Sequence, residues 1–492
     1  MKKIYLIMTV LCMSSFISCD KDVLTEKPKT LVVEGFYNTA GEVEAALGAI
    51  YAPLRGEMSG WWIGVLESHT EWGAGLTGAA NFDGYKTMQG LDAVSTNNLE
   101  RFWNAMYVSI RNANLVIKNA PLASSIPDAA KNQYIGEAKF MRAFTYFQLV
   151  RGWGGLPLYT EQNMGQTSGV PKSKKEDVYQ LMVNDLKFAE VNLPDNASAL
   201  GKPSKVIAKA LLADVYFYQG LHSEASKKAE EVIQSQKYSL ERVTVSNDFN
   251  KIFGIGASSK EEVFYLKYNQ TSPSELILFT QQIQTPWFGT QGFGIFTWHM
   301  ESKFYSNWDA RDLRKQFIWY ATDSKITNRY LQGQSAFPNS GVTLIAPKKY
   351  NAPTATIAAF DLPVYRYADI LLLYAEAVVR SSNMVTADGM EKLNMVRRRA
   401  YGYDSMVPSP VDFKASDYNV NSFIDLVLKE RGYEFQFEGK RWFDLVRSGR
   451  VKDVMQNAID RTVTDKHLLW PIPAAEFQLN EAFKPTDQNP GY

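Results

Sequence analysis

Hydrophobic residues recur at helical spacing over most of the chain. Val43, Leu47 and Ile50 fall on one helical face, and the capping-box spacing from Thr39 to Glu42 predicts where that helix begins. We therefore expect a mostly α-helical fold. The same period predicts further helices at about residues 98–119, 129–151, 175–191, 203–219, 223–235 and 361–377.

Two of the predicted helices, 203–219 and 223–235, form a helical hairpin with a repeat pattern. Leu212 and Tyr216 match the alternation of small and large residues in a tetratricopeptide repeat, although Ala229 replaces its usual later Phe. One repeat cannot bury both of its faces, so neighbouring helix pairs have to stack against it. The expected architecture is a tetratricopeptide-like helical repeat scaffold.

Residues 56–98 lack the helical period. Glycines recur through this stretch and interrupt regular structure, while Trp61, Trp62 and Trp72 lie among polar and acidic residues. Ordering a long loop costs entropy, so a long loop that carries large rings is usually functional. We expect this stretch to be a binding loop.

A second irregular region spans residues 239–362. Aromatic residues and glycines are concentrated at 287–320, which predicts loops and short strands rather than packed helices. We expect the two flanking helical parts to pack together as one globular unit. The expected division is an N-terminal helical part at 39–238, an aromatic-rich insertion at 239–362 and a C-terminal helical part at 363–492.

The composition is that of an ordinary globular protein. Hydrophobic residues make up 45% of the 492 residues and the net charge is +1, so no basic excess indicates a nucleic-acid partner. The four histidines lie far apart, and none has a metal-binding spacing. We expect no cofactor, although a calcium ion held by an irregular oxygen cage would leave no sequence signature.

The start of the chain has the pattern of a lipoprotein signal. Positive charges precede an apolar run of about fourteen residues, which is too short for a membrane span of about twenty. Ser18 and Cys19 then look like the end of a lipobox. We expect a signal peptide at 1–18, acylation of Cys19 by chains such as palmitate, and a tether at 19–38. The alternative is cleavage at another small residue, which would give a secreted protein without an anchor.

Residues 428–449 interleave opposite charges with aromatic and apolar side chains. A packed helix face tolerates so many charges only if they pair. We interpret this stretch as a buried or half-buried ion-pair network that holds helices together, not as a set of catalytic acids and bases. Its charged members are Glu430, Arg431, Glu434, Glu438, Arg441, Asp444 and Arg447.

The same stretch resembles the C-terminal signature of the SusD/RagB family. In this chain the signature is written Glu430-Arg431, Glu434-Phe435, Glu438-Gly439, Arg441-Trp442, Asp444-Leu445, Arg447 and Gly449. The resemblance extends from the lipobox to the last residue. Further strings that are similar to the family lie at 137–158, 361–377, 393–400, 469–473 and 488–492.

This resemblance implies a location, a function and a partner. Family members are outer-membrane lipoproteins of glycan-uptake systems, so we expect a protein that is anchored by lipid alone and faces the exterior. Asp20 and Asp22 after the cysteine resemble the export signal of surface lipoproteins in Bacteroidetes. The implied function is non-catalytic capture of oligosaccharides or polysaccharides and their delivery to a SusC-like TonB-dependent transporter.

Glycan binding requires flat rings that stack on sugars, together with polar side chains that bond the hydroxyls. Exposed rings are costly in an extracellular protein unless a ligand covers them. The competing interpretation is that these rings belong to the core, where Trp is mostly found. The predicted glycan-binding residues are Trp61, Trp62, Trp72, Asn81, Asp83, Trp287, Phe288, Trp298, Trp308 and Arg311.

Two alternatives remain open at this point. Glu67 and Glu71, beside Trp72, could form the carboxylate pair of a surface glycoside hydrolase, which needs two acids across a sugar cleft. A second carboxylate pair, Asp309 and Asp312, lies next to arginines and favours a salt-bridged turn instead. The aromatic loops would also suit a protein that binds peptides or another nutrient.

Overall fold

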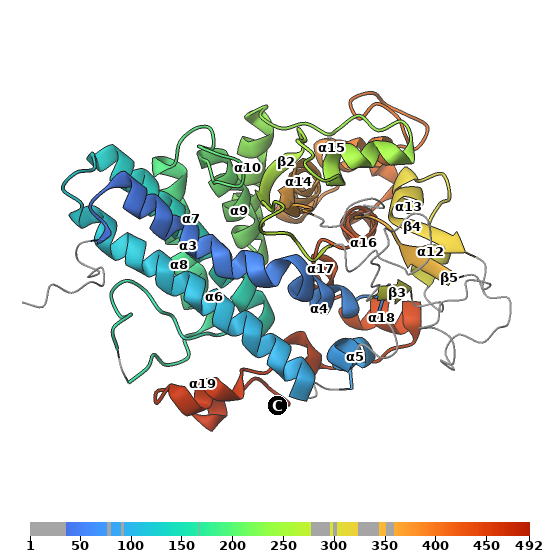
Figure 1. Ribbon diagram of the computed structural model, residues 1–492. Coiled ribbons are helices and arrows are strands. Elements are labelled where there is room, and N and C mark those ends of the chain that lie inside the picture. Colours follow the sequence, from blue (N-terminus) through green and yellow to red (C-terminus); the bar gives the residue numbers. More distant parts are fainter. Residues whose placement is uncertain are drawn as a thin grey trace, which may run out of the picture.

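Helices dominate the computed structural model of the chain (Figure 1). In the part that the structure describes, no helix is both long enough and apolar enough to cross a bilayer. The described residues are 36–75, 80–89, 93–166, 168–276, 296–298, 303–322, 344–350 and 359–492.

The N-terminal helices stack in chain order as a helical repeat scaffold. Helix α3 packs on α6, α6 on α7, α7 on α8, α8 on α9 and α9 on α10, so each helix buries its apolar face against its neighbours. The mostly α, tetratricopeptide-like fold expected from the sequence is confirmed. The helices are α3 (Ala40–Glu57), α6 (Ala93–Asn119), α7 (Asp128–Trp153), α8 (Lys175–Asn192), α9 (Lys205–Tyr218) and α10 (His222–Gln234).

The C-terminal helices continue this packing. Helix α14 packs against α10 of the repeat scaffold and also against α15 and α16. The two helical parts of the chain therefore share one hydrophobic core. These helices are α14 (Tyr367–Ser382), α15 (Ala387–Ala400), α16 (Val420–Glu434), α17 (Arg441–Arg447), α18 (Val451–Ile459) and α19 (Ala474–Leu479).

Within the residues that the structure describes, short strands form three two-stranded antiparallel sheets between segments that are distant in the chain. Strand β2 (Glu262–Leu266) pairs with β6 (Leu362–Arg366), so the region between the helical parts leaves and returns at the same place. The other pairs are β1 (Gly73–Gly75) with β3 (Phe296–Trp298) and β4 (Trp319–Thr322) with β5 (Leu344–Pro347). Short helices α11 (Asn250–Phe253), α12 (Lys303–Ser306) and α13 (Leu313–Ile318) accompany them. In Figure 1, β3, β4, β5, α12 and α13 gather at one end of the molecule.

The predicted binding loop at 56–98 is wrong for much of its length. The helix does not end after Gly56: it continues as a π-helix at Met58–Trp62 and then as α4 (Ile63–Ser68), and α5 (Ala80–Thr87) follows later. Gly60 serves close packing rather than a turn, because a Cβ at this position would lie 2.6 Å from the Cβ of Glu275. The prediction of an irregular segment, which relied on the spacing of glycines, is therefore wrong here.

Candidate functional site

The charged stretch at 428–449 forms a buried ion-pair network with partners from several other segments of the chain. Arg366, at the end of β6, donates to Glu261, Glu434 and Glu438 at 2.8 to 3.1 Å. Arg399 of α15 binds the same Glu261 and Glu434. Glu434, the last residue of α16, therefore binds both the end of β6 and helix α15. This confirms the interpretation of the stretch as a structural network.

The network, which we call the hub, is balanced in charge. Burial alone would raise the pKa of Glu434, but the guanidinium groups of Arg399, Arg366 and Arg314 hold this pKa far below its usual range. Because a buried charge is costly without a partner, the balance is what makes the hub tolerable in the interior. Its carboxylates are Glu261, Asp312, Glu430, Glu434 and Glu438, and its cations are Arg314, Lys349, Arg366, Arg397 and Arg399.

Glu67 of α4 ties the N-terminal scaffold to the hub. Its carboxylate accepts one hydrogen bond from the backbone N–H of Gly439 at 2.9 Å and one from the indole N–H of Trp72 at 2.8 Å. Burial raises the pKa of Glu67 to about 7, against these donors, which lower it. Gly439 has φ +70°, and a Cβ there would lie 2.7 Å from the Cδ1 of Ile63, so only glycine fits this junction without strain.

Glu71 also has a structural partner. Its carboxylate binds the guanidinium of Arg441 at 2.5 Å, and Arg441 donates a further hydrogen bond to the carbonyl of Leu428. Glu67 is 0% exposed and Glu71 is 1% exposed. Both carboxylates are buried and already bind scaffold donors, so the geometry gives no support to a Glu67/Glu71 hydrolase, although Glu71 also lines the groove described next.

An open groove lies beside this junction, between α12, α16, α17 and α18. We call it the α12–α18 groove, and its cavity volume is about 690 Å³, within the usual size of a small-ligand site. It is lined by Glu71, Lys303, Phe304, Asn307, Asp425, Leu428, Lys429, Tyr433, Arg441, Leu445, Arg450, Asp453, Val454, Asn457 and Ala458.

Aromatic rings lead from the core into this groove. Tyr433 stacks on the buried Trp308 with ring centroids 4.4 Å apart and an angle of 9° between the ring planes. The half-buried Phe304 contacts Tyr433 at 5.1 Å and Trp72 at 4.8 Å. The buried rings therefore hold Phe304 in place at the groove wall.

Polar side chains surround these rings. Lys303, Asn307, Lys429, Asp453 and Asn457 are exposed around the groove. Arg450 and Asp425 close one side by an ion pair of 2.8 Å. Amide, carboxylate and ammonium groups around a fixed ring can bond the hydroxyls of a ligand while the ring covers an apolar face.

The structure contradicts several of the predicted site residues. Trp62, Trp72 and Trp308 were expected to be exposed, but each is at most 2% exposed. Trp62 packs against Trp470 and Trp153, and the indole N–H of Trp308 donates to Asp312. These three rings belong to the core and cannot stack on a ligand in this structure.

Of the remaining predicted residues, the structure describes the side chains of Trp61 and Arg311 but not those of the others. Trp61 is half-buried on the π-helix, next to the guanidinium of Arg101. Arg311 is exposed and forms an ion pair with Asp309 at 2.7 Å, so the predicted salt-bridged turn is confirmed together with the Asp312–Arg314 pair. Trp287, Phe288 and the side chains of Asn81, Asp83 and Trp298 lie outside the described residues, as do the signal peptide and Cys19.

The sequence interpretation missed the residues that form the groove. Phe304 lies within the aromatic-rich stretch at 287–320 but was not selected, and Tyr433 was assigned only to the ion-pair stretch. Asn307 and Asn457 carry no sequence signal of their own. Their proximity depends on the packing of α12 against α18, which are far apart in the chain.

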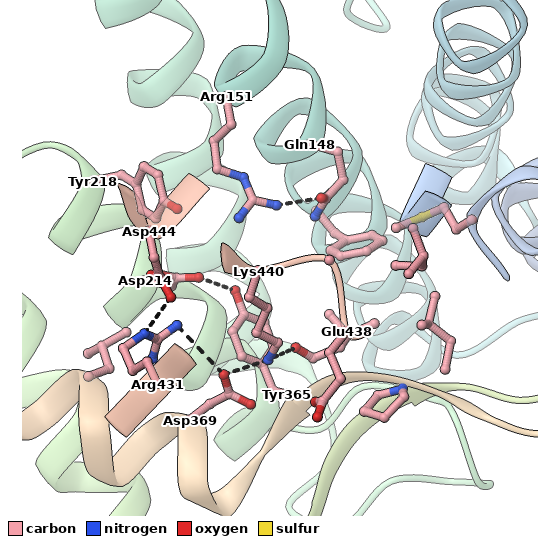
Figure 2. A pocket seen from close by; sticks show the side chains of 18 of the residues that line it. Gln148, Arg151, Asp214, Tyr218, Tyr365, Asp369, Arg431, Glu438, Lys440 and Asp444 are labelled. Atoms are coloured by element: carbon pink, nitrogen blue, oxygen red, sulfur yellow. Dashed lines mark hydrogen bonds and ion pairs between the residues drawn. The ribbon is translucent and has the colours of Figure 1, made fainter. Parts of the chain in front are cut away.

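A smaller internal cavity separates the hub from the repeat scaffold (Figure 2). Its volume is about 60 Å³, which is room for a few water molecules. In Figure 2, Arg431 and Lys440 point toward Asp369, and Tyr365 donates to Asp214 at 2.7 Å. Its size and its paired charges suit buried water rather than a ligand. Among the residues with a described position, no group of three or more His, Cys, Asp or Glu could hold a metal ion.

Stacked helix pairs with an inserted region of short strands define a helical-repeat protein. Residues 296–492 match the family model described as SusD family, and residues 69–217 match one described as "Starch-binding associating with outer membrane". The chain belongs to the SusD/RagB family, as its C-terminal signature indicated.

Curated relatives agree with this assignment. SusD-like protein P2 of Formosa agariphila is 26% identical over 100% of both chains. A SusD-like protein of Bacteroides ovatus is 25% identical over 88% of this chain and 80% of its own.

Solved structures share the fold. A SusD homolog from Bacteroides thetaiotaomicron has a TM-score of 0.79 at 23% identity, covering 95% of this chain and 100% of that one. Surface glycan-binding protein A from Bacteroides thetaiotaomicron, in complex with laminarihexaose, has a TM-score of 0.70 at 20% identity and covers 92% of this chain and 99% of that chain.

Proposed function

We propose that the protein is a non-catalytic glycan-binding protein of the cell surface, and that the α12–α18 groove forms part of its glycan site. The observation that carries this proposal is the fixed ring of Phe304 at the wall of an open groove with a polar rim. The laminarihexaose complex of a protein with the same fold supports it.

The groove has the chemistry that a sugar needs. The face of Phe304 can cover the C–H face of a pyranose ring, while Asn307, Asn457 and Asp453 can bond its hydroxyls. Tyr433 is held from behind by Trp308, so the ring wall does not have to be ordered when a ligand binds. Such preorganisation reduces the entropic cost of binding.

The proposal excludes hydrolysis by the carboxylates that the sequence singled out. Glu67 binds Trp72 and Gly439, and Glu71 binds Arg441, so neither is available as an acid or a nucleophile. We expect no release of reducing ends from any glycan that binds.

Lipid attachment at Cys19, placement on the outer face of the outer membrane and delivery to a SusC-like TonB-dependent transporter complete the proposal. The lipobox supports them, as does the match of residues 69–217 to the family described as "Starch-binding associating with outer membrane". Purification of the native protein in mild detergent should recover a TonB-dependent barrel with it. Labelled fatty acid should be incorporated by the wild type and not by the Cys19→Ala variant.

Calorimetric titration of the protein from Asp20 onward tests glycan binding. The panel should contain β-glucans such as laminarihexaose, α-glucans, mannans and xylans, with acidic glycans kept apart. We expect one neutral glycan class to bind, and Phe304→Ala to weaken it about tenfold. Asn184→Ala, on an exposed face of α8, is the matched control and should bind as the wild type does. Unchanged affinity in Phe304→Ala would remove the groove from the site.

A further inference from the structure

A second groove lies between segment 236–242, which follows α10, and loop 403–406, which follows α15. We call it the α10–α15 groove, and it shares no lining residue with the α12–α18 groove. We propose that it is a second saccharide site, for an uncharged sugar whose hydroxyl groups donate to carboxylates on both walls. A saccharide can occupy this groove whether or not the α12–α18 groove binds one.

The α10–α15 groove has room for a small ligand. Its cavity volume is about 560 Å³, within the usual range for a ligand pocket. Segment 236–242 forms one wall and loop 403–406 forms the other, and side chains of α14 and α15 complete the lining. The groove is therefore built from segments that are distant in the chain.

Hydrogen bonds hold both walls in place without a ligand. In the first wall, Glu241 N–H donates to the carboxylate of Glu261 at 2.9 Å. In the second wall, Tyr403 N–H donates to the carbonyl of Arg398 at 2.9 Å, and the guanidinium of Arg398 donates to the carbonyl of Ser405 at 3.0 Å. Because the walls are already ordered, binding has a smaller entropic cost.

Most of the positive charge in the groove is already paired. Lys392 forms an ion pair with Asp388 at 2.9 Å. Arg399 is bound by two carboxylates of the hub. The remaining cation of the lining is Arg242, which donates to two main-chain carbonyls. The groove therefore has little positive charge to offer to an anionic ligand.

Each wall carries a carboxylate with one free oxygen. Glu241 accepts through Oε1 from Lys260 N–H at 2.7 Å and from the hydroxyl of Ser259 at 3.2 Å. Asp404 accepts through Oδ1 from Met406 N–H at 2.9 Å. Within the described part of the chain, neither carboxylate forms an ion pair, and nothing donates to the second oxygen of either one. Each carboxylate therefore keeps its negative charge and one oxygen for a ligand.

Sugar hydroxyl groups suit these two oxygens. A hydroxyl donates to a carboxylate, and hydrogen bonds to an ionised acceptor are stronger than bonds between neutral groups. A carboxylate or sulfate on the ligand would instead meet two like charges. A peptide offers only one main-chain donor per residue, whereas a sugar ring carries several hydroxyl groups. The hydroxyl of Ser239 and the amide of Gln236 add further partners for a sugar.

Aromatic rings on both walls complete the site. Tyr403 is 41% exposed on the second wall. Tyr238 is half-buried on the first wall, and its side chain forms a hydrogen bond with Ser204. Such rings can cover the apolar faces of a sugar. Rings together with charged acceptors therefore favour an uncharged saccharide.

Calorimetric titration of the Phe304→Ala variant with neutral oligosaccharides isolates this site. The probes are laminarihexaose, maltohexaose, mannohexaose and xylohexaose. We expect one of them to bind, and the added substitutions Glu241→Gln and Asp404→Asn to weaken this binding about tenfold or more, because they remove the charges and keep the shapes. The matched control adds Glu176→Gln and Asp177→Asn, at exposed positions of α8, and should stay within about twofold.

Two variants of Tyr403 test the ring. Tyr403→Ala should weaken the same binding about tenfold, while Tyr403→Phe, which keeps the ring, should retain it. Equal thermal midpoints of the variants and their parent show that each variant is folded.

The outcomes separate the two grooves. The second site is overturned if Phe304→Ala binds none of the probes, or if the Glu241→Gln/Asp404→Asn variant binds as tightly as its matched control. In the wild-type background, a loss of affinity confined to Phe304→Ala overturns the α10–α15 groove and keeps the α12–α18 groove. A loss confined to the two carboxylate substitutions overturns the α12–α18 groove and keeps the α10–α15 groove.

Discussion

Trp470 occupies the space that a side chain at position 152 would need. A Cβ on Gly152 would lie 2.6 Å from the indole ring of Trp470, and the backbone N–H of Trp470 donates to the carbonyl of Gly152 at 2.8 Å. Trp153, the next residue, donates its indole N–H to the carbonyl of Pro471 at 2.9 Å. The segment around Trp470 is therefore bound to the end of α7 by backbone and ring together.

The Gly152→Ala variant should lose stability. The added methyl group has to displace the buried Trp470 ring, and overpacking of this kind typically costs about 1 to 3 kcal/mol. Gly48→Ala is the control, since nothing lies within 4 Å of its Cβ position on α3. It should be neutral or stabilising by up to about 1 kcal/mol. Urea unfolding measures both, and equal stability of the two variants would contradict the close packing at Gly152.

The Arg366→Met variant should be strongly destabilised. It leaves Glu261, Glu434 and Glu438 buried with fewer cations, and breaking a buried ion pair costs about 3 to 5 kcal/mol. Arg101→Met removes an arginine whose ion pair with Glu57 is partly exposed, and this loss should cost about 1 kcal/mol or less. The free energies of unfolding in urea compare the two. A loss in Arg366→Met as small as in Arg101→Met would refute the role of the hub.

His69 should make stability depend on pH below neutrality. Its Nδ1 faces the carbonyl of Val65 at 2.8 Å, and the indole N–H of Trp470 lies 3.5 Å from its Nε2, so the ring is held neutral. Burial lowers the pKa of His69 from 6.5 to about 4. As the pH falls from 6.5 toward 4, His69 therefore binds a proton in the unfolded chain but not in the folded chain. The stabilisation is fully present above pH 6.5 and decreases through this window, by about 1.4 kcal/mol per pH unit at most.

The His69→Gln variant isolates this effect. Urea unfolding between pH 4 and 7 should show a weaker fall in stability with acid than the wild type shows. Glu67 acts with the opposite sign, because its raised pKa of about 7 means that stability is lost as pH rises from 4.5 to 7. Its contribution is present in both proteins and cancels in the difference. Identical pH profiles of the variant and the wild type would count against a neutral, buried His69.

The Phe304→Leu variant should separate stacking from packing in the α12–α18 groove. Leu keeps apolar volume against Trp72 and Tyr433 but has no flat face for a sugar. We expect its glycan affinity to fall nearly as far as that of Phe304→Ala, a loss of about 1 to 2 kcal/mol in binding free energy, with a smaller loss of stability. Full affinity in Phe304→Leu would show that the ring contributes only to the scaffold.

The ion-pair network was predictable from sequence because buried charges need partners of opposite charge. Glu430, Glu434 and Glu438 recur every four residues among aromatic side chains, and a packed interior can accept them only with partners. The capping box from Thr39 to Glu42 was predictable because its hydrogen bonds join residues close in the chain.

The exposure of tryptophan was not predictable in the same way. Neighbouring glycines suggested loops around Trp62 and Trp72, but these rings are covered by segments from distant parts of the chain. One local signal was available: the indole N–H of Trp72 donates to Glu67, and that of Trp308 donates to Asp312. A carboxylate four or five residues from a Trp can therefore indicate a buried indole whose donor is already satisfied.

The contact between Gly152 and Trp470 also bears on the order in which the molecule can fold. The ring cluster around Trp153 contains Trp62 and Trp103 from the first helices, and Trp470 completes it by edge contacts at 4.9 Å to Trp153 and 5.3 Å to Trp62. Because Trp470 and Trp153 lie far apart in the chain, closing this ring cluster carries a large loop-closure entropy. Closure of the core is therefore a long-range step, unlike the local stacking of neighbouring repeat helices.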